Sequence, residues 1–179
     1  MAGRNRHIKG DINPIIAPVH SYHIVEAGDF MVLNSTSYYA DKGITADNYA
    51  VPFNEINGDT TNGGPQQNHW VYTKFLGVAM EDSPAGVTEN ITIATTGVFR
   101  YPMHSMISPS AVTIGSKISA VSPTLTGGNG VSQQIVIHGT TGIRVSTAYL
   151  GYIVKTESGA SFVDFAMYSA FGPGGLVSQ

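Results

Sequence analysis

Apolar and polar residues alternate most clearly between Phe75 and Met103, where the pattern predicts two strands joined by a polar turn. In the second strand, expected from Thr88 to Phe99, Ile91 and Ile93 share one face while threonine and alanine take the other. The turn is expected at 83–86, because its proline fixes one backbone dihedral and its glycine permits a positive one. The segment has the pattern of a scaffold, with few side chains suited to catalysis.

Helical periodicity is hard to find in the rest of the chain, while Gly, Pro, Asn and Asp recur about every eight to twelve residues. That punctuation predicts many short strands and a mainly β fold. Further strands are expected at Phe30–Leu33, His69–Leu76, Lys117–Val121 and Gln134–His138. The best helix candidate is a single turn at Ser105–Ala111, with a loop as the alternative.

The length of 179 residues predicts one domain with an extended N-terminal arm. We expect the arm to cover residues 1–23, the β domain residues 24–170 and a C-terminal tail residues 171–179. Polar, glycine-rich stretches at 34–67 and 122–134 predict long loops within the β domain. For the N-terminal segment, packing inside the molecule as a first strand is the open alternative to an arm.

Charged residues make up only 12% of the chain, about half the usual share, while hydrophobic residues make up 42%. So few surface charges favour a protein that oligomerises or attaches to a lattice, because a monomer needs them for solubility. The net charge of −3 is unevenly divided, since Arg4, Arg6 and Lys9 face no acid within residues 1–10 and the remainder is acidic. A basic arm therefore precedes an acidic body.

Composition also excludes several classes of partner. Three cations form a thin patch, and no alternation of arginine with aromatic residues supports base stacking, so we expect no nucleic-acid partner. The chain contains no cysteine, which excludes disulfides and thiolate metal sites. No apolar run approaches the roughly 20 residues of a membrane span, and the N-terminus lacks the apolar core of a signal peptide. We therefore expect synthesis in a cytoplasm and no membrane partner.

Candidate catalytic and metal-binding residues are few. His20 and His23 would lie on opposite faces of a strand, which suits no metal site. The neighbouring acids Glu81 and Asp82 are expected to form a solvated polar turn rather than an acid–base pair. The sequence contains neither a nucleophile elbow nor a phosphate-binding loop. It therefore predicts a protein that is not an enzyme and that uses no metal or other cofactor.

Several of these segments together carry a family resemblance. They are Gly77-Val-Ala-Met-Glu-Asp82, Gly97-Val-Phe99, Ile114-Gly-Ser-Lys-Ile118, Leu150-Gly-Tyr-Ile-Val154 and Phe162-Val-Asp-Phe-Ala166. In these motifs the chain resembles the head decoration, or capsid cement, proteins of tailed bacteriophages, of the lambda-like kind. The resemblance covers the region from 74 to 168. The first seventy residues and the stretch 124–134 have no counterpart in it.

The resemblance implies a small β-barrel or β-tulip-like body that forms a homotrimer. It further implies a protein on the outer surface of the virion, which stabilises the expanded capsid by bridging major capsid protein subunits. Within this interpretation we assign capsid contact to the N-terminal arm, through Arg4, Arg6, Lys9, Ile12, Ile15 and Ile16. Such an arm can add a strand to the exposed edge of a neighbouring sheet.

Two other functions stay open. A carbohydrate- or surface-binding β module of a phage particle would need an exposed aromatic platform, for which the candidates are Tyr38, Tyr39, Tyr49, Trp70 and Tyr72. A hydrolase or isomerase would need distant residues to converge in a cleft, namely His69, His104 or His138 on Asp82 or Asp164. Each function predicts a different arrangement of side chains in the folded chain.

Overall fold

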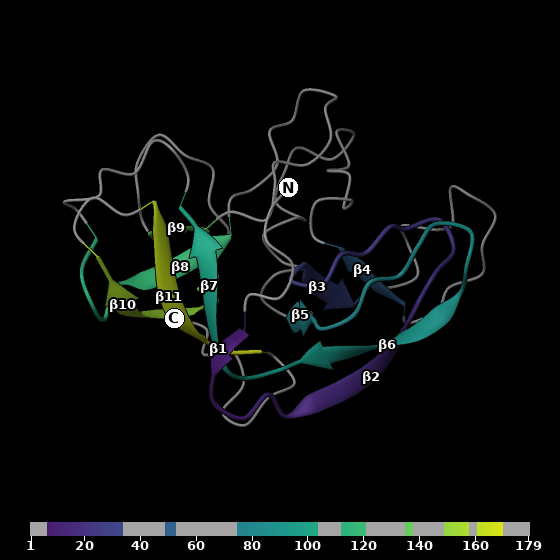
Figure 1. Cartoon of the computed structure of the whole chain (residues 1–179), viewed down its shortest axis with the longest axis horizontal. Helices are drawn as coiled ribbons and strands as arrows, with labels where there is room; N and C mark the ends of the chain where they lie inside the picture. Colours follow the sequence, from purple (N-terminus) through teal and green to yellow (C-terminus); the bar gives the residue numbers. More distant parts are fainter. Residues whose placement is uncertain are drawn as a thin grey trace.

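The computed structural model describes residues 7–33, 49–52, 75–103, 112–120, 135–137, 149–157 and 161–169. These residues form eleven strands in two sheets and contain no helix. The predicted mainly β fold is confirmed, and so is a small barrel body, because one of the two sheets is closed. Figure 1 shows the closed sheet on the right and the open sheet on the left.

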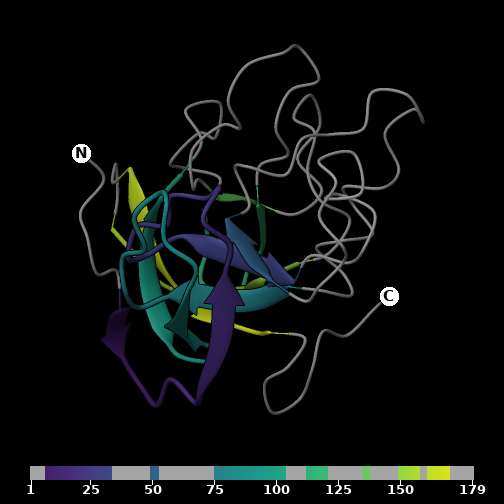
Figure 2. The ribbon, with the colours of Figure 1, turned by 90° about the vertical axis from the view of Figure 1, so that its right-hand side faces the viewer.

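Five strands close the barrel in the order β2-β4-β3-β5-β6. Their bounds are β2 Pro14–Val19, β3 Phe30–Leu33, β4 Ala50–Pro52, β5 Phe75–Ala79 and β6 Glu89–Ala94. Neighbouring strands are antiparallel except β2 and β4, which run parallel and meet at Val19 and Ala50 alone. Figure 2 views the molecule from the barrel side.

The second sheet has six strands, all antiparallel, in the order β1-β7-β11-β10-β8-β9. Their bounds are β1 His7–Lys9, β7 Val98–Pro102, β8 Lys117–Ala120, β9 Ile135–Ile137, β10 Gly151–Thr156 and β11 Phe162–Met167. The strands predicted at 117–121 and 134–138 are confirmed as β8 and β9, and these two pair with each other.

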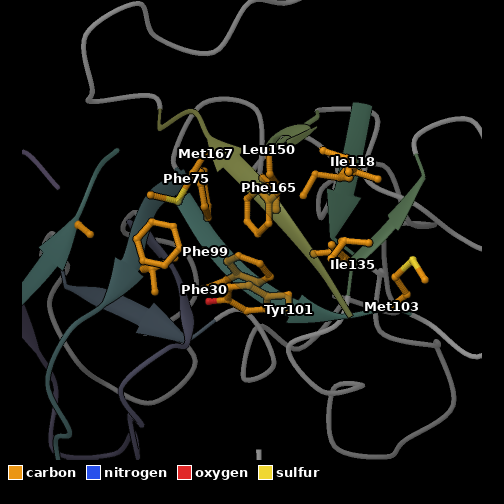
Figure 3. Packing of buried hydrophobic residues seen from close by; sticks show 14 of the residues in the cluster. Phe30, Phe75, Phe99, Tyr101, Met103, Ile118, Ile135, Leu150, Phe165 and Met167 are labelled. Atoms are coloured by element: carbon orange, nitrogen blue, oxygen red, sulfur yellow. The ribbon is translucent and has the colours of Figure 1, made fainter. Parts of the chain in front are cut away.

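Aromatic side chains fill the space between the barrel and the six-stranded sheet. Phe30 of β3 and Tyr101 of β7 stack with ring centroids 4.3 Å apart, and Phe165 of β11 lies 5.5 Å from Tyr101 (Figure 3). The Tyr101 hydroxyl donates a hydrogen bond to the Gly28 carbonyl, so its polar atom is satisfied inside the core. Both sheets contribute side chains to this core, and it joins them into one body.

A second, smaller core fills the barrel itself. Along β3, Met31 belongs to the barrel core, while Phe30 and Val32 belong to the core between the sheets. The strands β3, β4 and β5 are therefore buried on both faces. This explains why β3, predicted correctly at 30–33, and β5 are continuous apolar runs, whereas β6 alternates.

The strand predicted from Thr88 to Phe99 is wrong in one respect, because it is two strands separated by a bend at 95–97. The first, β6, belongs to the barrel, with Ile91 and Ile93 buried inside as predicted. The second, β7, belongs to the six-stranded sheet. The buried residues Phe99 and Tyr101 keep the odd-numbered phase of Ile91 and Ile93, so the phase of the pattern is the same on both sides of the break.

A second segment crosses between the sheets beside this bend. The amides of Thr95 and Thr96 donate to the Ile12 carbonyl at 2.8 and 3.2 Å, and the Thr96 hydroxyl donates to the Asp11 carbonyl at 2.7 Å. Asn13, with a φ of 38°, turns the chain into β2. Since β1 pairs with β7 and β2 with β6, one bent ribbon of two chain segments runs through both sheets.

The N-terminal segment, over its described length, is part of the fold. The strand β2 pairs with β6 along all six of its residues, and its Ala17 and Val19 are buried in the barrel core. The expected boundary between an arm at 1–23 and a β domain from residue 24 is therefore not seen within residues 7–23. Of the two alternatives, packing as first strands is the one that the structure shows here, because the apolar face of β2 is covered by the barrel.

The loop expected at 34–67 is interrupted by the strand β4, all three residues of which are buried. Three residues are too few to show a period, so the pattern could not indicate this strand. Four other expectations fall on parts of the chain outside the described residues. They are the loop at 122–134, the helix candidate Ser105–Ala111, the strand at His69–Leu76 before residue 75, and the tail at 171–179.

One glycine in each sheet allows two strands to approach closely. A Cβ added to Gly77 of β5 would lie 1.9 Å from the Ala94 carbonyl oxygen, and one added to Gly151 of β10 would lie 1.9 Å from that of Ala166. No side chain fits at either distance, so glycine is required at both positions. Gly77 also has a positive φ of 144°.

Candidate functional site

The outward face of β2 carries a short apolar strip without charge. Because Ala17 and Val19 are buried in the barrel, the alternate residues face outward, namely Pro14, Ile16 and Pro18. Ile16 is 74% exposed, more than any other large hydrophobic residue in the described part of the chain. We call Pro14, Ile16 and Pro18 the β2 strip.

Backbone hydrogen bonds show in which direction the N–H and C=O groups of the β2 strip point. Thr92 of β6 faces Ile16 across the ladder, yet its carbonyl accepts the Met80 N–H and its N–H donates to the Glu81 carboxylate. The backbone groups of Thr92 therefore point away from β2, and those of Ile16 point toward the opposite edge of β2. The two prolines of the strip share this direction and have no N–H to offer. This edge meets β4 at Val19, and along its other residues it is poor in the N–H donors that a further strand would need.

The residues assigned to capsid contact from the sequence fall into different environments. Lys9 is exposed at the end of β1, and Ile16 is exposed in the strip. Ile12 packs partly buried against the core between the sheets, and Ile15 packs against the barrel core. Arg4 and Arg6 lie outside the described residues. Of the apolar candidates, Ile16 is thus the one whose side chain is most available to a partner.

The outer face of the six-stranded sheet forms a second surface, which centres on an ion pair. Arg100 of β7 binds Asp164 of β11 with both prongs, Nε to Oδ1 at 2.7 Å and Nη2 to Oδ2 at 3.0 Å. The hydrogen bond to Asp164 raises the pKa of Arg100, so its charge is secure. With Phe162 and Lys155 the pair lines a hollow of about 170 Å³.

Tyrosines extend this outer face across β10 and β8. Tyr152 is opposite Lys117 on one side, and its ring lies 5.6 Å from that of Tyr168. Burial, and next a hydrogen bond with Tyr152, raise the pKa of Tyr168. The Lys117 ammonium lies 4.5 Å from the ring centre of Tyr149. We call the following residues the sheet face: Arg100, Lys117, Tyr152, Lys155, Phe162 and Tyr168.

A third surface lies at the tip of the barrel, where two turns run side by side. Val25 and Ser83 exchange both backbone hydrogen bonds, each 2.9 Å long. Around Val25, alternate residues are exposed, with Tyr22 at 58%, Ile24 at 57% and Glu26 also on the surface. We call Tyr22, Ile24 and Glu26 the tip segment. It combines an aromatic, an aliphatic and an acidic side chain on one side of the chain.

His20 anchors the base of the tip segment. Its ring stacks on Tyr22 at 4.7 Å and meets Tyr49 edge-on at 5.0 Å, and its Nδ1 accepts the Tyr22 N–H at 3.3 Å. Burial, and next the charge of nearby His23, lower the pKa of His20. Tyr49 thus packs against a histidine. The other four candidates for an aromatic platform lie outside the described residues.

The acidic residues considered for catalysis accept hydrogen bonds from backbone amides or form an ion pair with arginine. Glu81 accepts the N–H and the hydroxyl of Thr92 at 3.1 and 2.8 Å, and Asp82 accepts the Ala27 N–H at 2.8 Å. Asp164 binds Arg100, and the three histidines that could have approached it lie outside the described residues. Within the described ranges, no cluster of three or more His, Asp or Glu could hold a metal ion. No helix there has the length and apolarity to cross a membrane.

Sequence reasoning did not single out the Arg100–Asp164 pair. One signal was present: Asp164 is the only charged residue in the apolar run 162–166, and an acid in a buried strand needs a partner. Which base would supply that partner depends on the pairing of β7 with β11. The order of strands in the sheet was not derivable from the pattern.

Comparisons with protein-family models, with curated proteins and with solved structures find no match for this chain.

Proposed function

We propose that this protein is a structural virion protein that binds the outside of a phage capsid. It stabilises the expanded lattice by bridging major capsid protein subunits, and it acts as a self-associated unit, for which the resemblance implies a homotrimer. The support is the family resemblance over 74–168 together with the small β-barrel body. The exposure of Ile16 in the β2 strip is the single observation that carries the contact itself.

The β2 strip has the properties of a docking surface for another protein. Two prolines flank Ile16, so the strip is rigid and loses little conformational entropy on binding. Its outward side chains carry no charge, and a partner that covers them leaves no ion unpaired. Burying an isoleucine side chain contributes about 1.5–3 kcal/mol per copy. Many copies on one lattice multiply that contribution.

The structure changes the mechanism of contact that we first expected. Addition of the N-terminal segment to a neighbour's sheet would require free backbone along 14–19, but β2 already pairs with β6. The other edge of β2 meets β4 at Val19 and is poor in N–H donors, because Pro14 and Pro18 have none. We therefore propose contact through the side chains of the strip rather than through a shared sheet. Binding only to the expanded lattice stabilises that lattice by mass action.

The test is co-sedimentation of the protein with expanded capsids that lack the decoration protein. Deleting residues 1–16 would remove half of β2 and unfold the barrel, so the informative variant is Ile16→Glu in the full chain. We expect it to weaken capsid binding about tenfold or more, because it places a charge in the contact. Ile114→Glu is the matched control, since Ile114 is 69% exposed in the turn before β8.

Two results would overturn this proposal. Equal capsid binding by Ile16→Glu and Ile114→Glu would show that the β2 strip is not part of the contact. Absence of binding by the intact protein would show that it does not attach to capsids, and glycan arrays would then test the carbohydrate-binding alternative. A further variant that lacks residues 1–6 keeps every described strand and asks whether Arg4 and Arg6 contribute. If they do, the variant should bind more weakly at low salt, and its binding should fall less steeply with salt than that of the full chain.

A further inference from the structure

Charge is divided between the two sheets. The described residues of the barrel and its turns, 11–33, 49–52 and 75–97, include six carboxylates and neither lysine nor arginine. The described residues of the six-stranded sheet include four bases and two acids. These are Lys9, Arg100, Lys117 and Lys155, with Glu157 and Asp164. Among the described residues, the barrel is therefore acidic and the six-stranded sheet carries an excess of bases.

The tip segment and the sheet face are complementary in more than charge. The tip segment offers an aromatic ring, an aliphatic side chain and the carboxylate of Glu26. The sheet face offers apolar surface at Phe162, which is 53% exposed, and the ammonium of Lys155, whose ion pair with Glu157 is exposed and open to competition from another carboxylate. Both side chains line the hollow of about 170 Å³, together with the paired Arg100 and Asp164 and with Glu157, and the hollow has room for a side chain. An apolar and acidic segment is the chemistry that this face fits.

We propose that copies of this protein associate head to tail, with the tip segment of one copy on the sheet face of the next. Glu26 of one copy lies near Lys155 of the other, and Ile24 packs against Phe162. The contact joins two different surfaces, so it is heterologous and forms a ring where the rotation closes. This inference rests on the self-association included in the proposed function, and it adds which surfaces meet.

Sedimentation velocity of the full chain without capsids tests the contact, over a range of protein concentrations. We expect Glu26→Lys and Lys155→Glu each to weaken association about tenfold or more, because each reversal places like charges opposite one another. The Glu26 and Lys155 side chains are on the surface, and thermal unfolding of each variant verifies that it is folded.

Asp11→Lys is the matched control. It changes the net charge of the chain as much as Glu26→Lys does, but Asp11 precedes β2 and lies at the end of that strand opposite the tip. We expect this control to associate like the native chain. The double variant Glu26→Lys/Lys155→Glu should recover association, and an equimolar mixture of the two single variants should associate more tightly than either variant does alone.

The proposal is overturned if the native chain stays monomeric, if the single variants associate as the native chain does, or if the double variant is no better than either single variant. Capsid binding is not part of this experiment. A failed head-to-tail contact together with normal capsid binding would therefore leave the proposed function standing. Head-to-tail association without capsid binding would overturn the proposed function and leave the head-to-tail contact standing.

Discussion

The barrel and the six-stranded sheet each bring two strands together at a glycine, Gly77 against the Ala94 carbonyl in one and Gly151 against the Ala166 carbonyl in the other. Outside, they differ. The described barrel carries carboxylates without lysine or arginine, whereas the sheet is mostly basic. The packing inside these two sheets does not determine the charge of their outer surfaces. Two sheets that share one core and the same close approach of strands can therefore take different partners.

Replacing the glycines should break the shared interior most severely. We expect Gly77→Ala to lower the free energy of unfolding by about 3–5 kcal/mol, because the new Cβ meets a carbonyl oxygen and the φ of 144° strains any other residue. Gly151→Ala has the steric conflict without the positive φ, and should cost about 1–3 kcal/mol. Denaturant unfolding measures both.

Gly86→Ala is the control for backbone strain alone, since Gly86 has a φ of 91° and nothing lies within 4 Å of its added Cβ. It should cost about 1–2 kcal/mol. If Gly77→Ala cost no more than this control, the close approach of β5 to β6 would not be a structural requirement.

The second prediction concerns the core that joins the sheets. Tyr101→Phe keeps the stacking on Phe30 but leaves the Gly28 carbonyl without the hydroxyl that donates to it. We expect a loss of about 1–3 kcal/mol in the free energy of unfolding. Tyr168→Phe removes a hydroxyl from a more exposed ring and should cost less than about 0.5 kcal/mol. Similar losses in both variants would mean that the buried hydrogen bond of Tyr101 contributes no more to the free energy of unfolding than the hydroxyl of Tyr168 does.

The third prediction is confined to the barrel and depends on pH. A histidine whose pKa is lower in the folded chain binds fewer protons when folded. The free energy of unfolding should therefore fall as the pH drops below the unfolded pKa of 6.5, and level off below the lowered folded pKa of His20. Protonation also removes the acceptor for the Tyr22 N–H.

Thermal unfolding at several pH values, for the native chain and for His20→Gln, measures this effect. The native chain should lose more stability than the variant between pH 7 and pH 5, since the variant keeps every other titrating group. Identical pH profiles would show that His20 does not contribute to acid sensitivity.

The smallest effect is expected on the sheet face. Lys155 and Glu157 form an ion pair of 3.2 Å, but both side chains are more than half exposed. Glu157→Gln should therefore change the free energy of unfolding by less than about 0.5 kcal/mol. The same variant removes an acid from the basic face, so it should strengthen head-to-tail association. A large loss of stability would instead show that the Lys155–Glu157 ion pair is needed to stabilise the fold.

Patterns that repeat within a few residues predicted much of this fold. The strand at Phe30–Leu33 and the turn at Gly86 follow from local apolar runs and turn residues. The break at 95–97 did not, because the buried positions keep the same odd-numbered phase before and after it while the chain passes from one sheet to the other. The Arg100–Asp164 pair also depends on which strands are neighbours. Strand order is set by packing over the whole chain, so local periodicity does not predict it.

The bent ribbon formed by β1–β2 and β6–β7 has a consequence for how the molecule unfolds. Both sheets share its two chain segments, and residues 11–13 are hydrogen-bonded to Thr95 and Thr96 at the point of crossing. Neither sheet can lose its order without removing strands from the other. The described part of the chain should therefore melt in a single cooperative transition, with calorimetric and van't Hoff enthalpies that agree.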